Sequence, residues 1–478
     1  MSDTVQPMWL AGERTLSGQT LDVHNKFTGD RIAVVARASA NDVRAAIAAA
    51  ERAFEQTRDM PAFTRQAILQ QLVRHIEERR EELCRTVCLD AGKPIKDARG
   101  EVTRTIDTFR VAAEEATRLR GEYDPLDISP RAEGCESITR RFPIGPCGFI
   151  TPFNFPLNLA AHKVAPAIAV GCPFVLKPAS ATPLSALLLG EILSETEWPR
   201  AAFSVLPCAS RDIEPLVTDD RIRKLSFTGS PAVGWALKAK AGRKKVTLEL
   251  GGTAPCIVDR DADLDRAAER ITFGAFYQSG QSCISVQRVL IQADVYDDLR
   301  DRLVAGAEAL KAGDPMDEYT FIGPLITLDD ARRVEEWVNA AVKAGARVLC
   351  GGRRDGAIHA PTLLENTPRD QNVSCAEVFG PVATLEPFLN FKEAIRVAND
   401  TEFGLQAGVF TNNLDHAWYA FRQLDYAGVV LNDVPAFRVD SMPYGGIKQS
   451  GFGREGIRFA MHDMTELKLL VLNNIGRI

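Results

Sequence analysis

The sequence predicts an α/β protein with a doubly wound domain and a second α/β domain, on three observations. Short apolar runs recur from residue 145 onward, and helix-like segments lie between the earlier ones. The chain has 478 residues, more than one hydrophobic core usually organises. Its composition, 45% hydrophobic and 25% charged, is that of an ordinary globular protein.

Two amphipathic helical segments are expected before these strands. The first begins at an N-cap expected at Asn41, and the second runs from Pro61 to Val87. Their apolar residues recur at helical spacing: Val43, Ile47, Ala50 and Phe54 in the first, and Ile68, Leu72, Ile76 and Leu83 in the second.

The apolar runs form two series. The first, expected to make one doubly wound sheet, comprises CGFITPF, PFVLKPA, FSVLP, KLSFTGS, KVTLELGG and PCIVD. The second begins after residue 253 and comprises RVLIQ, ARVLCGG, AGVFTN and GVVLND. We expect a domain boundary near Gly251–Gly252, which assigns Cys283 to the second domain.

Composition excludes several functional classes. The formal charge is −6 and no long basic run stands out, so nucleic acid is not an expected partner. No signal peptide or run of 18 uncharged apolar residues is present, which favours a cytoplasmic protein with no membrane contact. The ten cysteines include no CxxC pair and the six histidines no metal-ligand spacing, so neither disulfides nor a metal is expected.

Three residues suggest chemistry on carbonyl groups. Cys283 follows Gly-Gln-Ser, a polar setting that suits a reactive thiol, although a small buried side chain is an equal alternative. Glu249 ends an apolar strand before two glycines, either as a ligand-facing carboxylate or as a solvated strand end. Asn154 follows another strand, where its amide can hold an oxyanion or form a turn.

Two further strand ends suggest a nucleotide. Gly229 and Ser230 lie at a strand-to-helix turn, and Lys177 and Ser180 end the run FVLKPAS. Each pair is a weak signal alone, and the GxGxxG fingerprint is absent.

Together these segments resemble the aldehyde dehydrogenase superfamily over essentially the whole chain. Eight motifs occur in the family's order: PFNFP, KPAS, FTGS, LELGG, GQSC, EVFGP, NDVPAF and PYGGIKQSG. The resemblance implies that Cys283 is the nucleophile, Glu249 the general base, and Asn154 with the Cys283 backbone N–H the oxyanion hole. It also implies NAD or NADP as cofactor, with these contacts: Thr151, Pro152, Phe153, Lys177, Ser180, Gly229, Ser230, Gly234, Leu250, Glu377 and Phe379.

The same resemblance assigns the domains. Residues 1–121 and 143–252 are expected to form a Rossmann-like dinucleotide-binding domain, and residues 253–446 the catalytic domain. Residues 122–142 and 460–478 are expected to be strands that pair across subunits, giving a homodimer or a homotetramer.

Two details refine the expected reaction. Coenzyme A-acylating relatives typically lack the glutamate retained here as Glu249, so a free carboxylic acid is the expected product. NAD-preferring relatives often carry glutamate where Ser180 stands, so NADP should be admitted, although NAD remains the alternative.

The resemblance extends to the branch that contains lactaldehyde, phosphonoacetaldehyde and non-phosphorylating glyceraldehyde-3-phosphate dehydrogenases. His162 stands where many relatives place an aromatic residue of the aldehyde tunnel, which suits a small oxygenated or anionic aldehyde; a satisfied core histidine is the alternative. Arg104 is a candidate anion ligand, and Ser282 replaces the arginine typical of the phosphonoacetaldehyde pattern. The expected pocket comprises His162, Arg104, Ser282, Ile284 and Phe437.

Two other functions stay open at this point. One is a succinic-semialdehyde-type dehydrogenase, and the other is a catalytically silent structural or binding member of the fold. Retention of Cys283, Glu249, Asn154 and Lys177 favours an enzyme.

Overall fold

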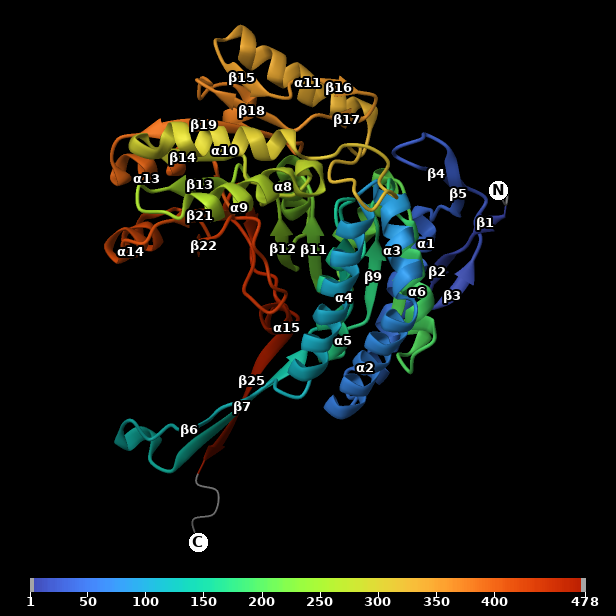
Figure 1. Cartoon of the computed structure of the whole chain (residues 1–478). Coiled ribbons are helices and arrows are strands. Elements are labelled where there is room, and N and C mark those ends of the chain that lie inside the picture. The colour runs from blue at the N-terminus through green and yellow to red at the C-terminus, as the bar shows by residue number, and fades with distance from the viewer. Residues whose placement is uncertain (1–3, 474–478) are drawn as a thin grey trace.

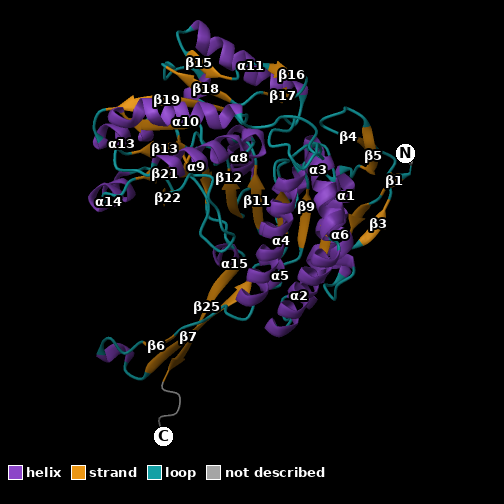
Figure 2. Cartoon of the chain, in the orientation of Figure 1, coloured by secondary structure: helices purple, strands orange, loops and turns teal. Residues whose placement is uncertain are grey.

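The computed structural model describes residues 4–473, which form two large sheets with their helices and a protruding β arm (Figure 1). Helices and strands alternate along most of the chain (Figure 2), which confirms the expected α/β class. The outermost residues of the expected segments 1–121 and 460–478 lie outside the described residues. Within residues 4–473, no helix is long and apolar enough to span a bilayer.

The first sheet has eight strands, five of them parallel and central. In spatial order they are β24 (Gly451–Phe452), β12 (Lys245–Glu249), β11 (Lys224–Thr228), β8 (Cys147–Ile150), β9 (Phe174–Lys177), β10 (Phe203–Val205), β2 (Met8–Leu10) and β3 (Glu13–Thr15). From β8 the chain adds β9 and β10 on one side, then β11 and β12 on the other. The strand order therefore reverses between β8 and β11, where open α/β sheets bind ligands.

Helices cover both faces of this sheet, because alternate strand residues enter two separate cores. Phe149 of β8 packs in one core and its neighbour Ile150 in the other. The first core includes α2 (Ala62–Glu78), α3 (Arg80–Ala91), α4 (Ile95–Glu115), α5 (Asn158–Val170) and α6 (Leu184–Ser194). The second includes α1 (Ala40–Thr57) and α7 (Glu214–Thr218), with α8 (Pro231–Lys240) beside it.

Two expectations about the N-terminal helices were wrong. Helix α1 is capped by Ser39 rather than Asn41, because the Ser39 hydroxyl accepts from the Asp42 N–H and the Asp42 carboxylate accepts from the Ser39 N–H. The segment from Pro61 to Val87 is two helices, since Arg79 leaves helical geometry between α2 and α3.

The second sheet has seven strands, of which only the edge strand β15 runs antiparallel to its neighbour. In order they are β15 (Arg347–Cys350), β18 (Thr362–Glu365), β19 (Val382–Phe388), β14 (Arg288–Gln292), β13 (Pro255–Val258), β21 (Gln406–Phe410) and β22 (Gly428–Leu431). The run PCIVD is β13, so its assignment to the first sheet was wrong, and β18 and β19 were not anticipated. We propose Gly251–Gly252, between β12 and β13, as the domain boundary.

The remaining helices and small sheets complete both domains. The second sheet is covered by α9 (Leu264–Phe276) and α10 (Tyr296–Glu308) in one core, α13 (Phe391–Asn399) and α14 (Leu414–Gln423) in another, and α11 (Leu328–Lys343) with α12 (Asn372–Cys375) in a third. The small sheets are β1 (Val5–Gln6) with β5 (Arg31–Ala36) and β4 (Thr20–His24), β16 (Arg354–Asp355) with β17 (Ile358–His359), and β20 (Phe403–Gly404) with β23 (Ile447–Lys448).

The arm is a three-stranded sheet that projects from the body (Figure 1). It consists of β6 (Tyr123–Pro125), β7 (Cys135–Pro143) and β25 (Thr465–Asn473). The expected bridging segment 460–478 is not strand from its start, because helix α15 (Ile457–Asp463) precedes β25.

Candidate active site

A cavity of about 710 Å³ lies at the carboxyl ends of β8, β9, β11 and β12, at the point where the strand order of the first sheet reverses. In the first sheet, the ends of β9 and β12 contribute Lys177 and Glu249, and the segment that follows β8 contributes Asn154. Segments that precede β14 and β19 of the second sheet contribute Cys283 and Glu377. A ligand in this cavity would therefore contact segments from both sheets.

A tight turn positions the cysteine. Gln278, Ser279 and Gly280 all have left-handed backbone, with φ of 53°, 57° and 70°. A Cβ atom on Gly280 would lie 2.1 Å from the Gly380 carbonyl oxygen, so only glycine fits there. The Ser279 hydroxyl donates to the Gly323 carbonyl at 2.9 Å and anchors the turn. Cys283 therefore stands on a rigid loop rather than on a mobile one.

Asn154 is tied to this turn from two directions. Its side-chain amide donates to the Gln281 carbonyl at 3.0 Å, and the Gln278 side chain donates to the Asn154 carbonyl. Asn154 is buried, and it lines the cavity together with Cys283. The loop after β8 and the turn before Cys283 thus hold each other in place.

The Cys283 thiol is half-buried and lies 3.1 Å from the Tyr444 phenol oxygen. Burial raises the pKa of Cys283 to about 12, while the hydrogen bond with Tyr444 acts in the opposite direction. The resting thiol is therefore protonated at neutral pH.

Glu249 ends β12 and is 3% exposed. Among residues 4–473 neither of its carboxyl oxygens has a hydrogen-bond partner, although the residue lines the cavity. Burial first, and the neighbouring Glu455 second, raise the pKa of Glu249 well above its ordinary value. This carboxyl is free to bind a water molecule or a ligand in the cavity.

The cavity also offers groups for a dinucleotide. The buried Lys177 ammonium donates to its neighbour's carbonyl oxygen at 2.9 Å, and burial lowers its pKa. Ser180 and the turn residues Gly229 and Ser230, which precede helix α8, also line the cavity. Glu377 accepts a hydrogen bond from the Gly252 N–H at 3.1 Å, and burial raises its pKa to about 7.

Most of the expected site residues line this cavity. They are Arg104, Thr151, Pro152, Phe153, Asn154, Lys177, Ser180, Gly229, Ser230, Glu249, Leu250, Ser282, Cys283, Ile284, Glu377 and Phe379.

Three expected site residues lie elsewhere. Gly234 packs under Leu250, whose side chain would lie 2.5 Å from a Cβ atom there, so this glycine serves helix–strand packing. Phe437 is 41% exposed and does not line the cavity. His162 is buried behind the cavity wall, where its Nε2 contacts Asp440 at 2.7 Å. The alternative of a core histidine therefore describes His162 better than a tunnel residue does.

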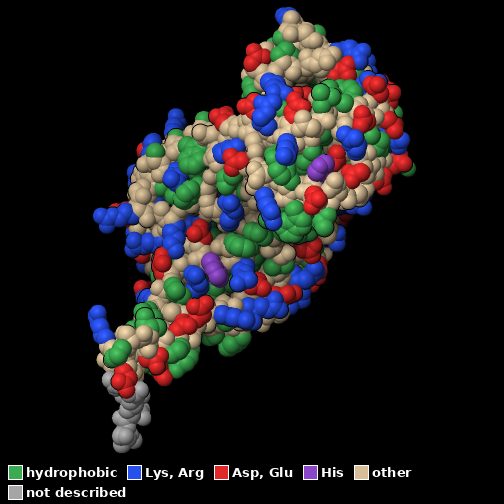
Figure 3. All heavy atoms as spheres, turned by 90° about the vertical axis from the view of Figure 1, so that its left-hand side faces the viewer, with side chains coloured by type: hydrophobic (Ala, Val, Ile, Leu, Met, Phe, Trp, Pro, Cys, Tyr) green, Lys and Arg blue, Asp and Glu red, His purple; other side chains and the backbone are tan. Residues whose placement is uncertain are grey.

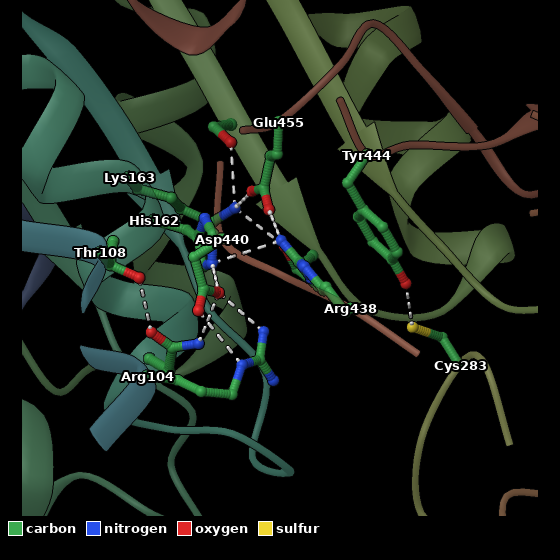
Figure 4. A network of polar contacts seen from close by, with 12 residues as sticks. Arg104, Thr108, His162, Lys163, Cys283, Arg438, Asp440, Tyr444 and Glu455 are labelled. Carbon is green, nitrogen blue, oxygen red and sulfur yellow. Dashed lines mark hydrogen bonds and ion pairs between the residues drawn. The ribbon is translucent and has the colours of Figure 1, made fainter. Parts of the chain in front are cut away.

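Sequence reasoning missed the polar network that joins the cavity-lining Arg104 to the buried His162 and to further charged groups (Figure 4). Asp440 accepts from Arg104 at 2.7 Å and also contacts His162. Glu455 pairs with Lys163 at 2.6 Å and with Arg438 at 3.4 Å. Lys163, Arg438, Asp440 and Glu455 lie outside the eight family motifs, and no local pattern distinguishes a buried charge from a solvated one.

The charges of this network do not cancel. The network has three basic side chains, Arg104, Arg438 and Lys163, and two ionised carboxylates, Asp440 and Glu455. Burial acts to raise the pKa of each carboxylate, yet the pKa of Asp440 is lowered, with the hydrogen bond to His162 as the largest opposing effect. The pairing with Lys163 likewise lowers the pKa of Glu455. Burial and Arg438 lower the pKa of His162, which is therefore neutral. Three positive charges against two negative ones leave a net charge of +1.

Comparisons with known proteins agree with this arrangement. A model of the aldehyde dehydrogenase family matches residues 13–470. A 3-sulfolactaldehyde dehydrogenase of Priestia aryabhattai is 41% identical over 98% of each chain. The structure of aldehyde dehydrogenase 21 from Physcomitrella patens, in complex with the reaction product succinate, is 50% identical with a TM-score of 0.98 over 100% of both chains. Glyceraldehyde-3-phosphate dehydrogenase GapN from Methanocaldococcus jannaschii, complexed with NADP, is 39% identical with a TM-score of 0.92, over 96% of this chain and all of its own.

Proposed function

The chain belongs to the aldehyde dehydrogenase family, and on that premise we propose that it oxidises a small aldehyde bearing an anionic group to the carboxylic acid. It is an aldehyde dehydrogenase that uses NAD or NADP. The observation that carries the proposal is one cavity lined by the Cys283 thiol, the Glu249 carboxyl and the guanidinium groups of Arg104 and Arg438.

The cavity's cofactor end fits a nicotinamide dinucleotide. Gly229 and Ser230 lie at the N-terminus of α8, which favours phosphate, and the buried Lys177 supplies a positive charge beside them. We assign Ser180 to the adenosine ribose and Glu377 to the nicotinamide ribose. The bound cofactor supplies the hydride acceptor.

We assign the carbon chemistry to Cys283. Its sulfur adds to the aldehyde carbon, and the carbonyl electrons move to oxygen, where the Asn154 amide and the Cys283 N–H hold the negative charge. Loss of hydride from this adduct leaves a thioester on Cys283. The rigid turn before Cys283 supports the assignment, since a fixed sulfur avoids the entropy cost of orienting it.

We assign hydrolysis of the thioester to Glu249. In its ionised form this carboxyl takes a proton from water, which then attacks the thioester carbon and releases the acid. Neither oxygen of the Glu249 carboxyl has a hydrogen-bond partner within residues 4–473, so both are free to bind that water, which supports this role.

The net charge of +1 supports a singly charged anionic substrate. Buried charge without a counter-ion is costly, so an anion at the arginine end of the cavity would stabilise the occupied state. Arg104 and Arg438 both line the cavity, and their guanidinium forks suit carboxylate or sulfonate groups. The relatives named for 3-sulfolactaldehyde and solved with succinate support the same class. Succinic semialdehyde is therefore a second candidate beside the short oxygenated aldehydes.

A substrate panel tests this proposal. We expect higher kcat/KM for 3-sulfolactaldehyde and succinic semialdehyde than for propanal and butanal, with NADP and NAD each tried. The variant Arg104→Met should raise KM for the anionic aldehydes and leave the neutral ones nearly unchanged. Equal kcat/KM for charged and neutral aldehydes would exclude an anion-selective site.

We further propose a homodimer or homotetramer in the cytoplasm. The arm strand β25 exposes four apolar side chains that a second subunit would cover: Leu467, Leu469, Leu470 and Val471. The ten cysteines are free thiols, as expected in a reducing compartment.

A further inference from the structure

The Cys283 thiol has one unusual neighbour, a phenol. The Tyr444 oxygen lies 3.1 Å from the sulfur, and both residues line the cavity (Figure 4). Among residues 4–473 the Tyr444 phenol has no other hydrogen-bond partner. Two backbone hydrogen bonds with Glu455 fix the tyrosine, one in each direction, at 3.1 and 2.6 Å. These backbone hydrogen bonds fix the Tyr444 main chain at a point from which its phenol reaches the Cys283 thiol.

A cation lies over the same ring. The Arg438 guanidinium carbon is 3.7 Å from the centre of the Tyr444 ring, close enough for a strong cation–π contact. Glu455 pairs with Arg438 and so holds it in place. A positive charge over the ring draws electron density from the phenol oxygen, which makes its O–H group a better hydrogen-bond donor.

The direction of the hydrogen bond follows from the two groups. A thiol is a weak donor and a weak acceptor, whereas a thiolate is a strong acceptor. Burial raises the pKa of Tyr444 well above its ordinary value, so the phenol keeps its proton and can donate it. The contact therefore strengthens when Cys283 loses its proton.

We propose that Tyr444 is a catalytic residue that donates a phenol hydrogen bond to the Cys283 thiolate and thereby increases the amount of thiolate present at neutral pH. The thiol proton leaves to water in the cavity, and the electron pair that stays on sulfur forms the bond to the aldehyde carbon. Tyr444 keeps its own proton throughout. This inference rests on the proposed role of Cys283 as nucleophile.

Alkylation of the full-length enzyme by iodoacetamide tests the proposal. Loss of a hydrogen bond to a charged group should raise the thiol pKa by about one unit, which leaves about tenfold less thiolate at neutral pH. Each thiolate becomes more reactive as its pKa rises, so the net loss in alkylation rate should be about threefold. We expect Tyr444→Phe to show this loss, together with a slower first-turnover hydride transfer and an unchanged cofactor Kd.

Two controls make the result specific. Tyr426→Phe removes another buried phenol, which donates to the Ala398 carbonyl at 2.7 Å outside the cavity, and should alkylate like wild type. Cys283→Ala identifies which part of the labelling belongs to Cys283 rather than to the exposed Cys375. Ultraviolet absorbance of the thiolate, taken as wild type minus Cys283→Ala, gives a second measure of the pKa.

The opposite outcomes separate the two proposals. If Tyr444→Phe alkylates as fast as wild type or faster, the phenol only accepts the S–H hydrogen and holds the thiol at rest, and the proposal for Tyr444 fails. If Cys283→Ala still oxidises aldehydes, the nucleophile assignment fails as well. A result of the first kind leaves the proposed function intact.

Discussion

Burial raises the pKa of Cys283 to about 12 and the pKa of Glu249 well above its ordinary value, so burial disfavours the charged form of each group. Their proposed roles need the opposite protonation states, a thiolate for attack and a carboxylate for hydrolysis. At the scale of single residues, the site is therefore organised to form charge only when a ligand or a hydrogen-bond donor stabilises it. Two predictions follow from single side chains.

Glu249→Gln should separate the two halves of the reaction. The thioester still forms, so we expect a burst of reduced nicotinamide followed by a steady-state rate at least about a hundredfold lower, typical for loss of a general base. In wild type the steady-state rate should rise with pH, because the raised pKa of Glu249 leaves more carboxylate at higher pH. Stopped-flow absorbance measures both phases. Absence of the burst would assign Glu249 an earlier role, such as deprotonation of Cys283.

Ser180→Glu should shift the cofactor preference toward NAD. Two unit charges about 4 Å apart repel by about 4 kcal/mol at an effective dielectric constant of about 20, and the NADP 2′-phosphate would face the new carboxylate. We expect kcat/KM with NADP to fall at least about tenfold, while kcat/KM with NAD is kept or improved. Ser180 does not face the ribose if the ratio of the two efficiencies stays unchanged.

At the scale of elements, the turn between α9 and β14 links the two halves of the site. Its three left-handed residues include two that are not glycine, Gln278 and Ser279, and such backbone costs of order 1–3 kcal/mol per residue. The strain persists because the Gln278 side chain and the Ser279 hydroxyl each bond a neighbouring segment. The conformation of this turn sets the position of Cys283 in the cavity.

Gly280→Ala should damage catalysis through this turn. The new Cβ atom would lie 2.1 Å from the Gly380 carbonyl oxygen in a left-handed backbone, so the turn and Cys283 must move. We expect kcat to fall at least about tenfold and the free energy of unfolding to drop by about 1–3 kcal/mol. Gly242→Ala is the matched control, since Gly242 also has positive φ but no atom within 4 Å of its Cβ position. Steady-state kinetics and denaturant unfolding of both variants show whether the loss comes from the contact with Gly380 or from the left-handed backbone, because Gly242→Ala has only the second.

At the scale of the whole molecule, the arm has no core of its own. Apolar side chains stand out on it near the lower end of the molecule (Figure 3). Its long pairing of β25 with β7 leaves a free edge on β25. A free, apolar edge of this kind is normally covered by a partner chain.

Leu469→Asp should weaken the assembly. Leu469 is 61% exposed on β25, and a charge there would have to be desolvated in an apolar contact between subunits. We expect wild type to be a dimer or a tetramer by light scattering and the variant to shift toward the monomer. Leu16→Asp, at a residue 64% exposed outside the arm, should leave the mass unchanged. A monomeric wild type at micromolar concentration would contradict the assembly itself.

The sequence by itself determined the fold class, the family and most strand ends. Parallel strands buried on both faces read as short apolar runs, so β8, β9, β11 and β12 could be located, and with them Asn154, Lys177 and Glu249 at their carboxyl ends. This information is local, because a strand and the residue that follows it are adjacent in the chain. The signal for the helix cap at Ser39 is also local, since Ser39 and Asp42 are three residues apart. It was missed because Asn41, another residue type that caps helices, stands nearby.

Only the tertiary structure decided which charges are buried and which residues face the ligand. Asp440 contacts Arg104 and His162 across 336 and 278 residues of sequence, and Tyr444 contacts Cys283 across 161. No periodicity records such contacts, because they join segments that are far apart in the sequence and meet only in the folded chain. The same reason explains why His162 proved to lie outside the cavity lining and why the net positive charge of the polar network became visible only in the fold.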